Sequence, residues 1–103
     1  MNRRALLEQM IANDPNDPFL QYGLALEYVK EQLLDEAEKL FDHLVERFPN
    51  YLPSYYQFGQ FLEQRGNTER ALDIYERGVA LATDQRDLKT KSELEEAIWE
   101  LKD

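Results

Sequence analysis

The sequence predicts an all-α protein made of stacked helical hairpins, and three observations support this prediction. Glycine and proline number only four each among 103 residues, which is few for an all-β protein that needs a turn every ~8–12 residues. Apolar side chains recur at the three- and four-residue spacing of amphipathic helices. The apolar pattern also returns after 34 residues, and repetition at a fixed period of this order is typical of stacked repeat architectures.

The repeat is visible at polar and apolar positions alike. Pro15-Asn16 recurs as Pro49-Asn50. The apolar matches extend over most of two units, and they pair Ala37 with Ala71, Leu40 with Ile74, Phe41 with Tyr75, Val45 with Val79, Leu24 with Phe58, Ala25 with Gly59 and Tyr28 with Leu62. Agreement at this many positions predicts two structurally equivalent units.

The first predicted helix, residues 3–12, matches only the second helix of a unit, because its apolar residues align with those 34 positions later. The first full unit then begins at Asp17, an N-cap, followed by Pro18 in the first turn, where the missing N–H costs nothing. Its first helix runs to about Gln32. The apolar residues of this helix recur at helical spacing: Leu20, Leu24 and Tyr28.

A short connection leads to the second helix of this unit, residues 35–48. Its first turn carries Asp35 and Glu36, where the helix dipole favours acids, and it ends before Pro49. This helix is expected to bury five apolar residues: Ala37, Leu40, Phe41, Leu44 and Val45.

The next unit repeats the plan with a helix over residues 53–65 that ends at Gly66, a natural left-handed C-cap. Asn67 then caps a helix that reaches about Ala82. A last helix ends near Leu101, and it starts either at Asp87 or at the capping box formed by Ser92 and Glu95. Its expected core stripe is Leu94, Ala97, Ile98 and Leu101, and Trp99 beside the stripe is expected to provide packing cover or to take part in an interface.

These residues resemble the tetratricopeptide repeat (TPR), a 34-residue helical hairpin. The resemblance is carried by Leu24, Ala25, Tyr28, Ala37, Phe41 and Pro49 in one unit, and by Tyr55, Phe58, Gly59, Leu62, Gly66, Ala71, Tyr75 and Gly78 in the next. It implies a right-handed superhelical stack of about six helices in one domain. Its parts are a half repeat (1–17), two repeats (18–51 and 52–85) and a C-terminal capping helix (86–103). The sequence departs from the family pattern at Gln21, Gln32, Leu44 and Thr83.

Charge and composition narrow the functional classes. The formal net charge is −9, and a surface this negative repels phosphate backbones, so the expected partner is a basic or apolar polypeptide segment and not nucleic acid. The absence of cysteine excludes disulfides, thiolate metal sites and cysteine nucleophiles. No apolar run approaches the ~20 residues that span a bilayer, and the N-terminus does not read as a secretory signal. A cytoplasmic location away from membranes is therefore expected.

Catalytic chemistry has little support in the sequence. His43 is the only histidine, and no partner stands at metal-ligand spacing from it. Two acidic groups, Asp35-Glu36-Glu38 and Glu93-Glu95-Glu96, are expected in first helical turns. We therefore expect no enzyme activity, no metal and no cofactor. A small hydrolase that uses His43 with a nearby acid is the remote alternative.

The first helix of the first unit has a second apolar face, and a helix that is apolar on two sides must be buried twice or bind something. The resemblance implies that this face, with its counterpart 34 residues later, lines a concave groove that binds a peptide or helix of a partner protein. The predicted groove residues are Phe19, Tyr22, Leu26, Val29, Lys30, Tyr56, Gln57, Gln60, Glu63 and Gln64.

Two alternatives stay open for this face. Phe19, Tyr22 and Leu26 would be core residues if the N-terminal helix packed over them. They would be interface residues if a second copy of the chain covered them. The second case gives a self-assembling structural homo-oligomer, possible as a homodimer, that associates through exposed terminal helices.

Overall fold

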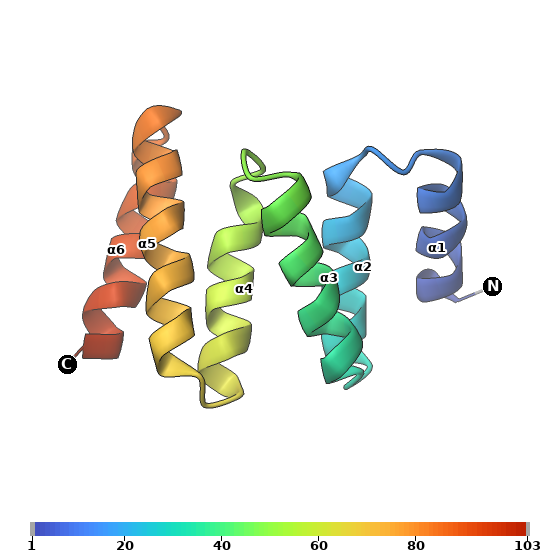
Figure 1. Ribbon diagram of the computed structural model, residues 1–103, viewed down its shortest axis with the longest axis horizontal. Coiled ribbons are helices and arrows are strands. Elements are labelled where there is room, and N and C mark those ends of the chain that lie inside the picture. Colours follow the sequence, from blue (N-terminus) through green and yellow to red (C-terminus); the bar gives the residue numbers. More distant parts are fainter. Residues whose placement is uncertain (1, 103) are drawn as a thin grey trace. The chain divides into compact units, whose positions relative to one another are not determined.

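The computed structural model describes residues 2–102, and within that range it contains six α-helices and no strand (Figure 1). The helices are α1 (Arg3–Asn13), α2 (Pro18–Lys30), α3 (Leu34–Arg47), α4 (Pro53–Gln64), α5 (Thr68–Asp84) and α6 (Leu88–Lys102). The all-α prediction is confirmed, and most helix ends lie within two residues of their predicted positions. No helix in residues 2–102 is long and apolar enough to cross a membrane.

The chain forms two compact units, Met1–Tyr51 and Leu52–Asp103. In the first unit α2 packs against both α1 and α3, and in the second unit α5 packs against both α4 and α6. Each unit therefore combines one helical hairpin with one additional helix. The hairpins are α2–α3 and α4–α5, and the additional helices are α1 and α6.

Small residues allow the close helix packing of the first unit. Ala25 of α2 and Ala37 of α3 are both completely buried, as is Phe41. α1 approaches α2 at Gly23, because a Cβ atom on Gly23 would lie 3.5 Å from Cδ2 of the buried Leu7. The alanines predicted at the hairpin contact thus lie in the core, and the unit has no room there for larger side chains.

The second unit depends on two glycines. A Cβ atom on Gly59 of α4 would overlap the ring of Tyr75 of α5, so the helices can approach this closely only at glycine. A Cβ atom on Gly78 would lie 2.8 Å from Cβ of Tyr55 and 3.0 Å from Cδ1 of Leu94. Gly78 therefore marks the place where α4, α5 and α6 come together.

Three helices end in the same turn. Gln32, Gly66 and Arg86 follow α2, α4 and α5 with φ angles of 62°, 84° and 59°. In each turn the next residue donates its N–H to the carbonyl five residues earlier, as in Leu33 N–H to Tyr28 O at 2.8 Å. This pattern is the Schellman motif. Gly66 was predicted at this position, whereas Gln32 adopts the left-handed conformation although it carries a side chain.

The start of the last helix is now settled. Asp87 accepts hydrogen bonds from the backbone N–H and the hydroxyl of Thr90, at 3.1 and 2.9 Å, and these bonds hold the pKa of its carboxyl below the usual value. α6 therefore begins at Leu88 and not at Ser92. As a result, the prediction that Glu93, Glu95 and Glu96 occupy a first helical turn is wrong, because they lie in the second and third turns of α6.

The packing role favoured for Trp99 is also wrong. Trp99 is 73% exposed, whereas Leu94 of the same helix is completely buried against α5 at Gly78. The predicted stripe of α6 therefore covers the second unit through Leu94, with Ala97, Ile98 and Leu101 only half-buried. Trp99 lies outside this contact.

Candidate partner-binding surfaces

The predicted groove residues of the first unit lie on α2, and none of them is fully buried. Phe19 is 64% exposed, so α1 does not bury it. Tyr22, Leu26 and Val29 are half-buried, and Lys30 is exposed. This face of α2 therefore presents aromatic and aliphatic side chains at its surface, and its role in binding remains a prediction.

Tyr22 has a defined neighbour within the first unit. Its ring meets the ring of Tyr51 edge to face, with the centroids 5.7 Å apart, which is a favourable arrangement for aromatic pairs. Partial burial raises the pKa of Tyr51 above its ordinary value, and Tyr22 and Asp17 act in the same direction. Tyr51 therefore stays neutral at physiological pH, and the two rings together offer apolar contact area.

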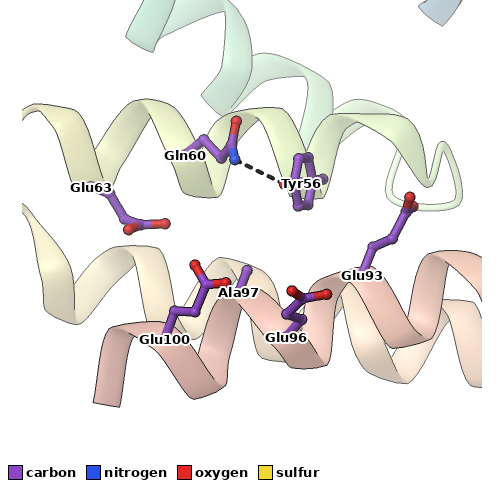
Figure 2. Close-up of a pocket in the computed structure, with 7 residues that line it drawn as sticks. All are labelled: Tyr56, Gln60, Glu63, Glu93, Glu96, Ala97 and Glu100. Atoms are coloured by element: carbon purple, nitrogen blue, oxygen red, sulfur yellow. Dashed lines mark hydrogen bonds between the residues drawn. The ribbon is translucent and has the colours of Figure 1, made fainter. Parts of the chain in front are cut away.

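The predicted residues of the second unit take part in a pocket. A pocket of ≈ 310 Å³ lies between α4 and α6. Figure 2 shows two rows of side chains facing each other across it. Its lining residues are Tyr56, Gln60 and Glu63 from α4, and Glu93, Glu96, Ala97 and Glu100 from α6. The predicted groove residues Gln57 and Gln64 do not line this pocket.

We call the pocket between α4 and α6 the acidic pocket. Hydrogen bonds hold the side chains of its α4 wall in place. The Nε2 amide of Gln60 donates to the hydroxyl of Tyr56 at 2.9 Å (Figure 2). The hydroxyl of Tyr75, from the core of the hairpin, donates to the carboxylate of Glu63. Burial and the bond to Glu63 together raise the pKa of Tyr75 far above its ordinary value. Tyr75 therefore remains a donor and orients Glu63 at the edge of the pocket.

Four carboxylates give the acidic pocket its charge. None of Glu63, Glu93, Glu96 and Glu100 forms an ion pair with another residue in the range 2–102, and the lining contains no Lys, Arg or His. Neighbouring charges of one sign in a concave site concentrate ions of the opposite sign. The arrangement can therefore hold a cationic group, with the Tyr56 ring as an apolar wall.

The three glutamates of α6 were missed as site residues, although the sequence holds a signal for them. Glu93, Glu96 and Glu100 recur at spacings of three and four, which places them on one face of a helix. The sequence pattern could not show that this face lies opposite α4, because that pairing depends on how α6 packs against α5.

A second pocket, of ≈ 390 Å³, lies in the first unit, and His43 is one of its lining residues. It is lined by Ile11, Pro15, Asn16, Gln21, Leu24, Leu40, His43, Arg47 and Phe48. His43 is exposed, and its ring lies 6.3 Å from that of Phe48. No Asp or Glu lines this pocket. Within residues 2–102 no group of three potential metal ligands is assembled.

The fold and these surfaces define an all-helical repeat protein, and comparison with known proteins identifies its family. Two family models described as tetratricopeptide repeat match residues 4–58 and residues 52–85. The chain belongs to the tetratricopeptide repeat family, as the sequence pattern predicted. No curated protein matches the sequence.

Solved structures agree with this assignment. A tetratricopeptide repeat domain protein from Salinibacter ruber is 38% identical, with 85% of this chain and 89% of that chain covered and a TM-score of 0.82. A protein from Bordetella parapertussis is 23% identical, with 98% and 88% covered and a TM-score of 0.82. PcrH, in complex with the chaperone-binding region of PopD, is 14% identical, with 96% and 75% covered and a TM-score of 0.85. The last two likenesses show the fold alone.

Proposed function

We propose that this protein is an adaptor that binds a segment of a partner protein, without chemistry of its own, and that the acidic pocket is its main contact site. The observation that carries the proposal is that Tyr56, Gln60 and Glu63 line the same pocket as the carboxylates of α6. The family resemblance had assigned these three residues to a partner-binding face. PcrH supplies a precedent for the fold, since its structure holds a region of PopD.

The chemistry of the pocket favours a partner segment with lysine or arginine side chains. A volume of ≈ 310 Å³ is at the lower end of the range for ligand pockets, roughly 300–1,000 Å³. It therefore suits one or two side chains better than a folded element. A guanidinium can bind a carboxylate with two parallel hydrogen bonds and can stack on an aromatic ring, and Glu96, Glu100 and Tyr56 offer both contacts.

The energetic contribution of the charges is modest because the pocket is open to water. An exposed ion pair contributes ~0.2–1 kcal/mol, so two such pairs account for up to ~2 kcal/mol, or about 30-fold in affinity. The larger effect is on association, because an acidic surface accelerates the approach of a basic segment and salt reduces this effect. The aromatic face of α2, with Phe19 and Tyr22, would supply additional apolar contact to the same or another segment.

The proposal is tested with peptides. Twelve-residue peptides that differ only in carrying lysine and arginine or aspartate and glutamate are titrated into the 103-residue chain by calorimetry, at low and high salt. We expect the basic peptides alone to bind, with an affinity that falls as salt rises. Equal binding of both sets, or binding of neither, would contradict the proposal.

A pair of double variants distinguishes the effect of the pocket carboxylates on binding from the effect of the protein's net charge. Glu96→Gln with Glu100→Gln removes two pocket carboxylates, and we expect it to weaken the binding of basic peptides by up to about 30-fold. Glu46→Gln with Asp73→Asn is the matched control, because it removes the same charge from exposed sites outside the pocket. If the control loses as much affinity as the pocket variant, the pocket is not the site and only the overall charge matters.

A further inference from the structure

α6 has an uncovered apolar face that is distinct from its acidic pocket face. A hollow of ≈ 550 Å³ on this side is lined by Glu76, Val79, Glu95, Ile98, Trp99 and Lys102, and most of the exposed lining is apolar. Trp99 is the most exposed large apolar side chain in residues 2–102. Within this range no helix covers the hollow, and an uncovered apolar surface of this kind is typical of interaction sites.

The position of α6 in the repeat shows what kind of helix fits this face. Its N-cap, Asp87, follows the N-cap of α2, Asp17, by 70 residues, and the buried Leu94 then corresponds to the buried Leu24. α6 therefore corresponds to the first helix of a hairpin. In this register Glu95 corresponds to Ala25, and in the first unit the partner of the corresponding helix α2 is the second helix α3. In the described part of the chain, no second helix packs on the uncovered face of α6.

α1 corresponds to the second helix of a hairpin, and within residues 2–102 no first helix of that hairpin packs beside it. Its residues Arg3, Leu7 and Met10 precede Ala37, Phe41 and Leu44 of α3 by 34 positions. Only Leu7 is buried, against α2 at Gly23. The neighbouring face of α1 leaves Leu6 48% and Met10 41% exposed. In residues 2–102, α1 therefore has the uncovered apolar face that is complementary to that of α6.

We infer that α6 of one copy pairs with α1 of a second copy, which completes a hairpin between chains and gives head-to-tail association. Charge complementarity supports this occupant. The hairpin contacts inside the chain place small, buried residues at two matched positions, Ala25 with Ala37 and Gly59 with Ala71. Between copies the same positions hold Glu95 and Arg3. Glu95 is exposed, and the side chain of Arg3 is 66% exposed although it lies 3.8 Å from Glu27. The two can form an ion pair.

The inferred interface is heterologous, so it has defined consequences. A head-to-tail contact builds rings or open filaments and does not stop at a symmetric dimer. A single helix pair falls below the ~1,200 Å² of buried surface typical of stable interfaces, so association is expected to be weak and reversible. The net charge of −9 opposes it, and physiological salt, with a Debye length of ~8 Å, reduces that opposition.

Two end-blocked variants test the inference directly. Leu6→Glu with Met10→Glu blocks α1, and Trp99→Glu blocks α6; all three residues are exposed, so the fold of each unit should be retained. Each variant alone is expected to sediment as a monomer at concentrations where the natural chain forms larger species. Their equimolar mixture is expected to form a dimer and nothing larger, because one interface remains intact in that pair.

Trp99 reports the contact, because it is the only tryptophan. In the mixture only the α1-blocked copy carries it, so its fluorescence should shift to shorter wavelength when α1 of the other variant covers it. Leu88→Glu, which removes another exposed apolar residue of α6 outside the hollow, is the control and should associate like the natural chain. A monomeric mixture with unshifted emission, self-association of either blocked variant alone, or a natural chain that stays monomeric at high concentration would overturn the inference.

Discussion

Gly59→Ala should destabilise the second unit, although alanine is the better helix former. The added Cβ atom would overlap the ring of Tyr75, which is completely buried and whose hydroxyl is held by Glu63. Overpacking of this kind costs ~1–3 kcal/mol, and the overlap with a tethered ring argues for the upper part of that range. The higher helix propensity of alanine compared with glycine offsets ~1 kcal/mol of this cost. We expect a net loss of about 2 kcal/mol.

The first unit supplies both a rescue and a control. At the equivalent positions it accommodates Ala25 with Phe41, a pair that has no hydroxyl. Gly59→Ala with Tyr75→Phe reproduces this pair, frees the ring from Glu63, and should recover most of the lost stability. Gly23→Ala is the control: the nearest atom would lie at 3.5 Å, an ordinary contact, so this change should stabilise α2 by up to ~1 kcal/mol.

The assay is urea unfolding followed by helical circular dichroism, with these three variants, the single variant Tyr75→Phe and the natural chain compared at one protein concentration. The double variant is judged by its departure from the sum of the single changes. A Gly59→Ala protein as stable as the natural chain would refute the packing argument. A double variant no better than Gly59→Ala would show that the hydroxyl tether is not what prevents the ring from moving.

Three further predictions follow from the same structure. Gln32→Gly should raise the free energy of unfolding by ~0.5–1 kcal/mol because φ is 62° there, whereas Gly66→Gln should lower it by a similar amount; equal effects in thermal melts would contradict the turn geometry. Ala37→Trp should unfold the α2–α3 hairpin, since Ala37 is completely buried, and unchanged circular dichroism and melting would disprove the register. The buried tyrosines should contribute their full share to the free energy of unfolding below about pH 10, the ordinary tyrosine pKa, and this contribution should be lost as the pH rises beyond it. The reason is that burial raises the pKa of four tyrosines in the folded chain, namely Tyr28, Tyr51, Tyr55 and Tyr75; titration of these four near pH 10 without unfolding would count against it.

The sequence predicted the helices well because their determinants are local. Asp17 and Asn67 accept hydrogen bonds from the first turns they precede, at 2.9 and 3.2 Å. Gly66 ends α4 in the left-handed conformation, as expected of a residue without a side chain. The last helix was harder to place because Asp87 and Ser92 both offer caps, and only the observed bonds to Thr90 distinguish them.

The sequence predicted the residues of only one wall of the acidic pocket, the wall formed by α4. Tyr56, Gln60 and Glu63 were predicted because they lie 34 residues after apolar residues of the first unit, and all three line the acidic pocket. The opposite wall comes from Glu93, Glu96 and Glu100; the first two had been predicted to lie in a first helical turn, where the helix dipole favours acids, and Glu100 had been assigned no role. A helical pattern shows which residues share a face, but it does not show which neighbour that face meets.

By itself, the sequence determined the helices, the turn at Gly66, the repeat and the family, because each depends on residues close together in the chain or on a period within it. Tertiary structure alone decided that α6 turns its glutamates toward α4 and leaves Trp99 exposed. The physical reason is that α6 carries apolar side chains over a wide arc, so that Leu94 and Trp99 are both plausible core residues in the pattern. Packing at Gly78 selects Leu94, and this choice fixes the direction of every other side chain on the helix.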